Sequence, residues 1–123
     1  MSKIVGSYKN AHSFEERKRE SEKVHERTPD RIPVICEKAE NSRIPDLDKA
    51  KYLVPPDVTV GAFLVSIRRR ITIEPEKSIF LFVGDTVPAN GTIMSDLYNA
   101  YKDDDGFLYV TYSAENTYGC QCS

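Results

Sequence analysis

The chain has 123 residues, a length that favours one small domain. Hydrophobic residues make up 40% of it and charged residues 29%, which allows one modest core and leaves no excess of apolar residues for a membrane span. Lys and Arg number 17 against 19 Asp and Glu, and this net charge of −2 argues against a protein whose main task is to hold a polyphosphate such as a nucleic acid.

The cysteines and the N-terminal residues bear on the compartment. Cys36, Cys120 and Cys122 are an odd number, and two of them lie in the last four residues, so they do not make a disulfide framework. The first eight residues contain too short an apolar run for a signal peptide. We therefore expect a protein that is made and kept in the reducing cytosol.

A charged helix is predicted near the N-terminus, from about residue 14 to residue 25. Ser13 and Glu16 have the spacing of a capping box at its start, and Thr28 followed by Pro29 ends it. Apolar residues are sparse in this segment, so the helix should lie on the surface and depend on packing against the rest of the protein.

Two short strands are predicted next, one over residues 31–38, which contain several β-branched side chains, and one over residues 51–54. Alternation divides the apolar side chains of the first strand between two faces: Ile32, Val34 and Cys36 on one, and Pro33 and Ile35 on a partly apolar outer face. After them, Thr59 can cap a helix that runs to about Arg70 and carries the clearest buried stripe in the chain.

The last third of the chain predicts a strand over residues 78–83, a short helix over 93–101 capped by Thr92, and a strand over 107–112. The acidic run 103–105 is expected to form a solvated turn, and the polar end of the chain a mobile tail. Two hairpin-like pairs of strands separated by one helix predict a mixed sheet in an α+β roll of the ubiquitin-like, β-grasp kind.

Nothing in the sequence indicates a catalytic centre. His12 and His25 lie in or beside the charged helix, away from any nucleophile motif, and are expected at the surface. Phosphate loops and metal-ligand spacings are missing too, so we expect a protein that is not an enzyme and holds no cofactor or metal. Two interpretations of residues 68–70, all Arg, stay open: they complement a helix dipole, or they belong to a basic rim that suits an acidic peptide.

The C-terminal residues also allow two interpretations. Gly119, at the end of a polar arm, has the small side-chain-free form that a processing or acyl-transfer enzyme needs when a backbone threads a narrow cleft. The last four residues, from Cys120 to Ser123, have instead the length of a prenylation box, although Gln121 matches its aliphatic position poorly. The residues alone do not choose between the two.

Several stretches, in order and spacing, resemble one family. They are Phe14-Glu-Glu-Arg-Lys-Arg-Glu-Ser-Glu22, Pro29-Asp-Arg-Ile-Pro-Val-Ile35, Asp46-Leu-Asp-Lys-Ala-Lys-Tyr-Leu-Val-Pro55, Thr59-Val-Gly-Ala-Phe63 and Phe107-Leu-Tyr-Val-Thr-Tyr-Ser113. From about Tyr8 to Gly119 the chain resembles the autophagy ubiquitin-like modifiers of the GABARAP and microtubule-associated light-chain type. The resemblance implies a β-grasp fold with a four-stranded mixed sheet and extra N-terminal helices. It divides the chain into a helical extension over residues 1–30, a ubiquitin-like domain over 31–113, and a flexible tail over 114–123 that is processed after Gly119.

The resemblance also implies a role without catalysis. A cysteine protease would cut the Gly119-Cys120 bond, and activating and conjugating enzymes would join Gly119 to phosphatidylethanolamine on the autophagosomal membrane. A hydrophilic domain without an apolar anchor needs such a covalent lipid to stay on a membrane. The alternative is a cytoskeletal or trafficking adaptor, prenylated at Cys120. We expect a cytoplasmic protein that moves to the autophagosomal membrane when it is lipidated.

Family members bind cargo receptors through extended peptides with an aromatic residue and, three positions on, an aliphatic one; such a peptide would add to residues 51–54 as a further strand. The resemblance places the aromatic pocket at Glu20, Val24, Pro33, Ile35, Lys51, Leu53 and Phe107. It places the aliphatic pocket at Tyr52, Val54, Pro55, Val58, Phe63 and Ser66, with Arg31 facing its end and Arg70 on the rim. Lys49 and Lys51 would meet acidic residues that precede the motif. Ser66 stands where the family usually has a large aliphatic residue, which should make the second pocket roomier or more polar.

Overall fold

The computed structural model describes residues 6–40 and 42–114 of the chain. The elements of this part follow the predicted order, preceded by a short helix, α1, for which the sequence pattern supplied no bounds. They are α1 (Gly6–Ala11), α2 (Phe14–Arg27), β1 (Ile32–Lys38), β2 (Lys51–Val54), α3 (Val60–Arg70), β3 (Phe80–Phe82), α4 (Met94–Tyr101) and β4 (Leu108–Ser113). None of the helices in the described ranges is long and apolar enough to cross a bilayer.

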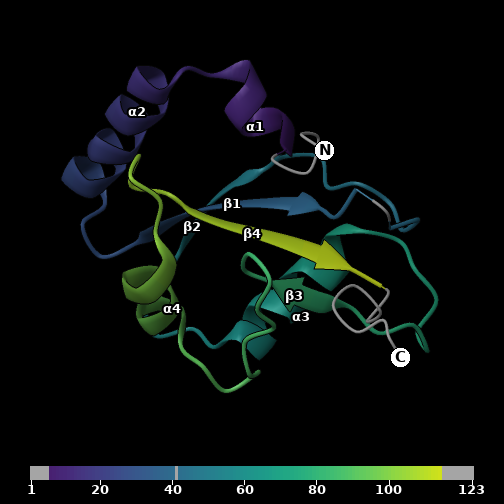
Figure 1. Ribbon diagram of the computed structural model, residues 1–123. Coiled ribbons are helices and arrows are strands. Elements are labelled where there is room, and N and C mark those ends of the chain that lie inside the picture. Colours follow the sequence, from purple (N-terminus) through teal and green to yellow (C-terminus); the bar gives the residue numbers. More distant parts are fainter. Residues whose placement is uncertain (1–5, 41, 115–123) are drawn as a thin grey trace.

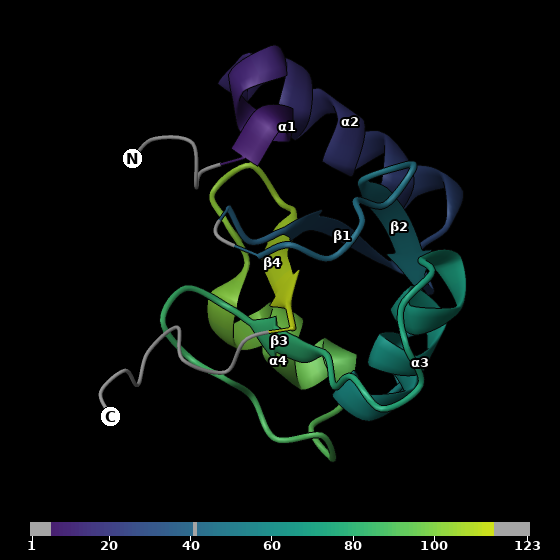
Figure 2. The same cartoon turned by 90° about the vertical axis from the view of Figure 1, so that its right-hand side faces the viewer.

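The strands form one mixed sheet in the order β2-β1-β4-β3 (Figure 1). Strand β1 runs antiparallel to β2 and parallel to β4, and β3 runs antiparallel to β4. Helices α3 and α4 lie on one side of the sheet, and α1 and α2 lie on the other (Figure 2). The predicted α+β, β-grasp architecture with N-terminal helices is confirmed.

The main core fills the space between the sheet and helix α3. Val60, Phe63 and Ile67 of α3 are buried there and pack with Val34 of β1 and Val110 of β4. The apolar stripe predicted on this helix is thus confirmed. It explains why α3 is held across the sheet, since a helix of this length depends on burying such a stripe.

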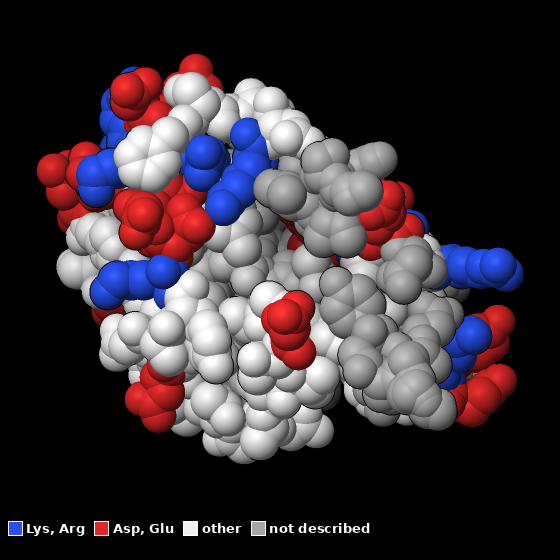
Figure 3. All heavy atoms as spheres, in the orientation of Figure 1, with Lys and Arg blue, Asp and Glu red and all other residues white. Residues whose placement is uncertain are grey.

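The second face of β1 is also buried, which the sequence pattern understated. Ile35 is 0% exposed and Pro33 is fully buried, although both were expected on an outer face. Helix α2 lies over this face and contributes the buried residues Ser21 and Val24 (Figure 2). The N-terminal helices therefore form a third layer that covers the sheet, and basic and acidic side chains both gather on the surface over α2 (Figure 3).

The predicted caps of α2 and α3 are confirmed. Ser13 and Glu16 form a complete capping box, with distances of 3.2 and 3.1 Å between each backbone nitrogen and the side-chain oxygen that it donates to. Thr59 Oγ1 accepts from the Ala62 amide at 3.1 Å. These local hydrogen bonds set where both helices begin.

The cap predicted for α4 is wrong. This helix begins after Ile93, not Thr92, and has no side-chain cap. Its first amides instead donate to the loop after β2: Met94 N–H to Val58 O at 2.7 Å, and Ser95 N–H to Pro56 O at 3.0 Å. Because backbone carbonyls satisfy these donors, the helix needs no polar side chain at its start.

Strand β3 is shorter than the predicted 78–83. Val83 and Thr86 bond to each other through both backbone amides, at 2.8 and 2.9 Å, around Gly84, whose φ is +60°. This tight turn takes Val83 away from β4 and ends the strand at Phe82.

Candidate functional site

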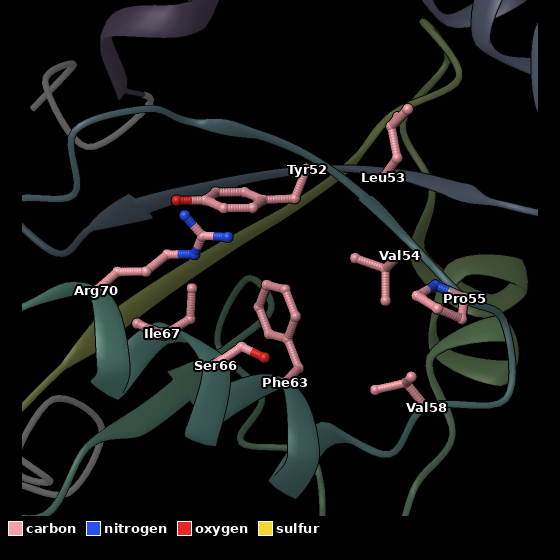
Figure 4. Close-up of a pocket in the computed structure, with 9 residues that line it drawn as sticks. All are labelled: Tyr52, Leu53, Val54, Pro55, Val58, Phe63, Ser66, Ile67 and Arg70. Carbon is pink, nitrogen blue, oxygen red and sulfur yellow. The ribbon is translucent and has the colours of Figure 1, made fainter.

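A pocket of about 160 Å³ lies between strand β2 and helix α3 (Figure 4). Its lining is mostly apolar and consists of Tyr52, Leu53, Val54, Pro55, Val58, Phe63, Ser66, Ile67 and Arg70. The structure thus brings together every residue that the family resemblance placed in the aliphatic pocket, and Arg70 from its rim. It adds Leu53, which was placed in the aromatic pocket, and Ile67, which the helical spacing marked only as part of a buried stripe.

Strand β2 forms one wall of this pocket and is an edge strand of the sheet, with β1 as its neighbour. Side chains alternate along it. Tyr52 and Val54 are buried on the α3 side, whereas Leu53 is 41% exposed. An edge strand next to an apolar pocket offers both main-chain groups and a side-chain site to an extended chain.

Helix α3 forms the other wall with Phe63, Ser66, Ile67 and Arg70, which recur at the spacing of one helix face. Phe63 is 4% exposed, and its ring meets the Tyr52 ring edge to face, with centroids 6.3 Å apart. Ser66 and Arg70 are exposed. The pocket therefore has an apolar floor and two polar groups along the α3 wall.

Tyr52 closes one end of the pocket beneath two cations. The Arg70 guanidinium carbon and Lys49 Nζ each lie 5.3 Å from the centre of its ring. Its hydroxyl donates to Lys49 O at 2.9 Å. Burial, followed by the nearby Cys36, raises the pKa of Tyr52 to about 12, so the phenol stays a neutral donor at physiological pH.

The residues placed in the aromatic pocket gather on the opposite face of β1 and β2, beneath α2. Pro33 pairs with Leu53 in the sheet register, and Ile35 pairs with Lys51. Pro33, Ile35 and Phe107 are fully buried, and Val24 is 7% exposed. These side chains pack as a closed cluster in this structure.

An ion pair joins β2 to α2 beside this cluster. Lys51 Nζ lies 2.5 Å from Glu20 Oε2, and both side chains are 38% exposed. The hydrogen bond from Lys51 lowers the pKa of the Glu20 carboxyl below its usual range.

A buried carboxylate holds α2 in this position, and sequence reasoning missed it. Asp105 was expected in a solvated turn but is 0% exposed. Its Oδ2 accepts from Arg17 Nη1 at 2.6 Å and from the Tyr109 hydroxyl at 2.5 Å, and its backbone oxygen accepts from Ser21 Oγ at 2.5 Å. Burial, followed by the hydrogen bond to Asp105, raises the pKa of the Tyr109 phenol. In the sequence, Asp105 is followed by Gly106 just before a strand. This pair predicts a tight turn, but it does not indicate that the Asp side chain points into the protein.

The remaining basic residues have separate roles. Arg31 is exposed and directly precedes Ile32, which pairs with Val54 at the end of β2. Arg68 donates to the carbonyls of residues 74 and 75, at 3.0 and 2.9 Å, and so fixes the loop after α3. Only Arg70 of the three consecutive arginines lines the pocket.

The two histidines are exposed, as predicted. His25 Nε2 lies 3.2 Å from the Tyr98 hydroxyl, and His12 Nδ1 lies 3.7 Å from Glu16 Oε1. Within the described ranges, no three His, Cys, Asp or Glu residues come together as metal ligands. Gly119 and the Gly119-Cys120 bond lie outside the described residues.

Comparison with known proteins places the chain among close relatives. A family model described as "Autophagy protein Atg8 ubiquitin like" matches residues 16–119. Autophagy-related protein 8 of Candida glabrata is 59% identical over 118 residues, which cover 96% of this chain and 100% of the relative. The protein of the same name from Mycosarcoma maydis is 58% identical over 92% of this chain and 96% of its own length.

Solved structures agree in fold. The crystal structure of Trypanosoma brucei ATG8 matches with a TM-score of 0.84 and 49% identity, over 88% of this chain and 93% of that one. Plasmodium falciparum Atg8, solved in complex with a Plasmodium falciparum Atg3 peptide, matches with a TM-score of 0.80 and 39% identity, over 89% of this chain and 97% of that one.

Proposed function

The chain belongs to the Atg8 family of autophagy ubiquitin-like modifiers, and we propose that it works without catalysis of its own, as a lipid-linked anchor for peptides. A processing cysteine protease cuts it after Gly119. Activating and conjugating enzymes then join Gly119 to phosphatidylethanolamine on the autophagosomal membrane, where the protein recruits cargo receptors. The observation that carries the peptide role is the pocket between α3 and the edge strand β2.

The groove supports peptide binding by strand addition. An extended peptide pairs with the free edge of β2, so the main chain supplies affinity for many sequences. The residue three positions after the aromatic one, the fourth of the peptide motif, enters the pocket between Tyr52 and Phe63. The Plasmodium falciparum relative was solved with an Atg3 peptide, which supports a peptide-binding role for this chain as well.

The aromatic residue of the motif binds on the other side of β2, in the cluster beneath α2. This step moves Lys51 away from Glu20, because Lys51 is the register partner of the buried Ile35 and its ion pair with Glu20 therefore borders the cluster. Acidic residues before the aromatic one then replace Glu20 as partners of Lys51. Lys49, exposed and 5.3 Å from the Tyr52 ring, adds a second cation for them, and Arg31 faces the other end of the peptide.

The division of the chain into a helical extension, a ubiquitin-like domain and a processed tail is part of the proposal. The match to the family model ends at residue 119, which supports Gly119 as the last residue of the mature protein. The four residues after it would then be removed.

Intact mass measurement of the membrane-bound protein, purified from cells, tests the C-terminal assignment. We expect a chain that ends at Gly119 and carries phosphatidylethanolamine. Gly119→Ala should leave the precursor uncut and off the membrane, whereas Cys120→Ser, the matched control, should be lipidated normally. A prenyl group on Cys120 in the recovered protein would overturn processing at Gly119 and favour the prenylated adaptor.

A further inference from the structure

The pocket between β2 and α3 has an uneven lining. Val54 and Phe63 supply apolar walls, but Ser66 and Arg70 place a hydroxyl and a guanidinium on the α3 side (Figure 4). Within residues 6–40 and 42–114, neither side chain has a hydrogen-bond or ion-pair partner. The Arg70 guanidinium carbon lies over the face of Tyr52, 5.3 Å from the centre of its ring.

The size of the pocket favours a ring. Its volume of about 160 Å³ is close to that of an apolar protein cavity, about 150 Å³, that is known to hold benzene. The pocket is open to solvent, so a valine side chain would leave part of its apolar wall in contact with water, whereas a ring would cover more of that wall. Ser66 is what keeps the space open, since a longer side chain at this position would project from α3 into the pocket.

The charge at the pocket favours an oxygen on that ring. Arg70 is a permanent cation with five N–H donors, and its guanidinium lies over Tyr52 at one end of the pocket. A phenol oxygen that reached this end would accept a charge-assisted hydrogen bond. A purely apolar side chain would instead leave the donors of Arg70 to water.

We propose that this pocket selects tyrosine at the fourth position of the bound motif, ahead of phenylalanine and well ahead of valine. Ser66 provides the room for the ring, and Arg70 recognises its oxygen. The inference rests on the proposed peptide-binding function and names the side chain that the same groove prefers.

Four synthetic peptides test it, each with three aspartates, tryptophan, two threonines and then valine, leucine, phenylalanine or tyrosine. Titration calorimetry on the wild-type protein should rank tyrosine first. Phenylalanine should bind more tightly than valine, and tyrosine about threefold to tenfold more tightly than phenylalanine, as expected for one net hydrogen bond.

Two sets of variants separate the roles of the two residues. Ser66→Leu, and Ser66→Val as a smaller change, should fill the pocket and remove the preference for both rings over valine. Arg70→Met keeps the length but not the donors, so it should bring tyrosine down to the level of phenylalanine. Val65→Ser is the matched control, because Val65 is 50% exposed on α3 and does not line the pocket; it should leave all four affinities unchanged.

The possible failures are distinguishable. If none of the four peptides binds the wild-type protein, the proposed groove is wrong and the inference falls with it. If the peptides bind but valine or leucine is preferred, or if Ser66→Leu leaves the ranking unchanged, the groove stands and the inference is overturned.

Discussion

Arg17 Nη1 of helix α2 lies 2.6 Å from Asp105 Oδ2 in the loop before β4, with side chains 12% and 0% exposed. The two residues are 88 positions apart in the sequence. Lys9 and Asp103 form a second link at 3.0 Å between the same regions. The N-terminal helices are therefore fastened to the core by charge as well as by apolar contact. Glu20, the partner of Lys51, lies on the same helix as Arg17.

Arg17→Ala should strongly destabilise the protein. It leaves the buried Asp105 carboxylate without its cation, and breaking a buried ion pair in this way costs about 3 kcal/mol or more. Lys18→Ala is the matched control, since the Lys18-Glu22 pair is exposed and 3.7 Å long. It should cost about 0.5 kcal/mol or less. Urea unfolding measures both, and equal free energies of unfolding would contradict a structural role for the Arg17-Asp105 pair.

Gly106→Ala should weaken the same attachment for a steric reason. Gly106 has a φ of +94°, and a Cβ there would lie 2.4 Å from Ser21 Oγ on α2. The strained backbone and the displaced helix together should cost about 2 kcal/mol or more of unfolding free energy. Gly91→Ala is the control, because nothing lies within 4 Å of its added methyl group. Thermal melting of both variants checks this, and a Gly106→Ala protein as stable as Gly91→Ala would show that α2 is not fixed at this point.

Elements governed by short-range rules were predictable from the sequence. The capping box at Ser13 and Glu16, the cap at Thr59 and the stripe of α3 all follow from spacing within a few residues. Thr92 is also a residue type that often caps helices, and yet it does not cap α4. The donors at the start of α4 bond to Val58 and Pro56, and the pattern of one segment does not show that another segment supplies acceptors.

The family resemblance, not the residue pattern, assigned the residues of the two pockets; the structure gathers one set around an open pocket and buries most of the other. Whether a pocket is open depends on distant contacts. The cluster around Ile35 is closed because α2 covers it, and α2 is held by Asp105, a residue that looks solvated in a run of three acids. Burial of a charge cannot be read locally when its partner lies 88 residues away.

Acid should loosen the link between α2 and β2. The pKa of Glu20 is lowered by its hydrogen bond with Lys51, so its stabilising contribution is present above the ordinary pKa, about 4.3, and is lost as the pH falls through the lower folded value. Both side chains are 38% exposed, which limits the effect to about 1 kcal/mol or less.

Urea unfolding of the wild type and of Glu20→Gln, at pH 7 and at about pH 3, measures this contribution. The variant should be less stable than the wild type at pH 7, and the difference between the two should be smaller in acid. Asp103 titrates in both proteins and cancels in the comparison. Burial acts to raise its pKa, but the hydrogen bonds from Lys9 and the Asp105 amide, together with the charges of Lys9 and Arg17, outweigh burial and lower it. A difference that does not change with pH would rule out the Glu20 charge as its source.

Leu53→Ala and Lys51→Glu should both weaken peptide binding at the edge of β2. Leu53 is 41% exposed and its truncation removes apolar contact on the peptide side, which should cost about tenfold in affinity. Lys51→Glu replaces the cation beside Glu20 with an anion, which repels the acidic residues before the motif. The loss of affinity should therefore be larger at low salt than at high salt. Val87→Ala is the control, because Val87 is 50% exposed in a loop outside the pocket. Fluorescence titration of one acidic peptide at two salt concentrations measures all three, and affinities that match the control in both groove variants would remove β2 as the docking edge.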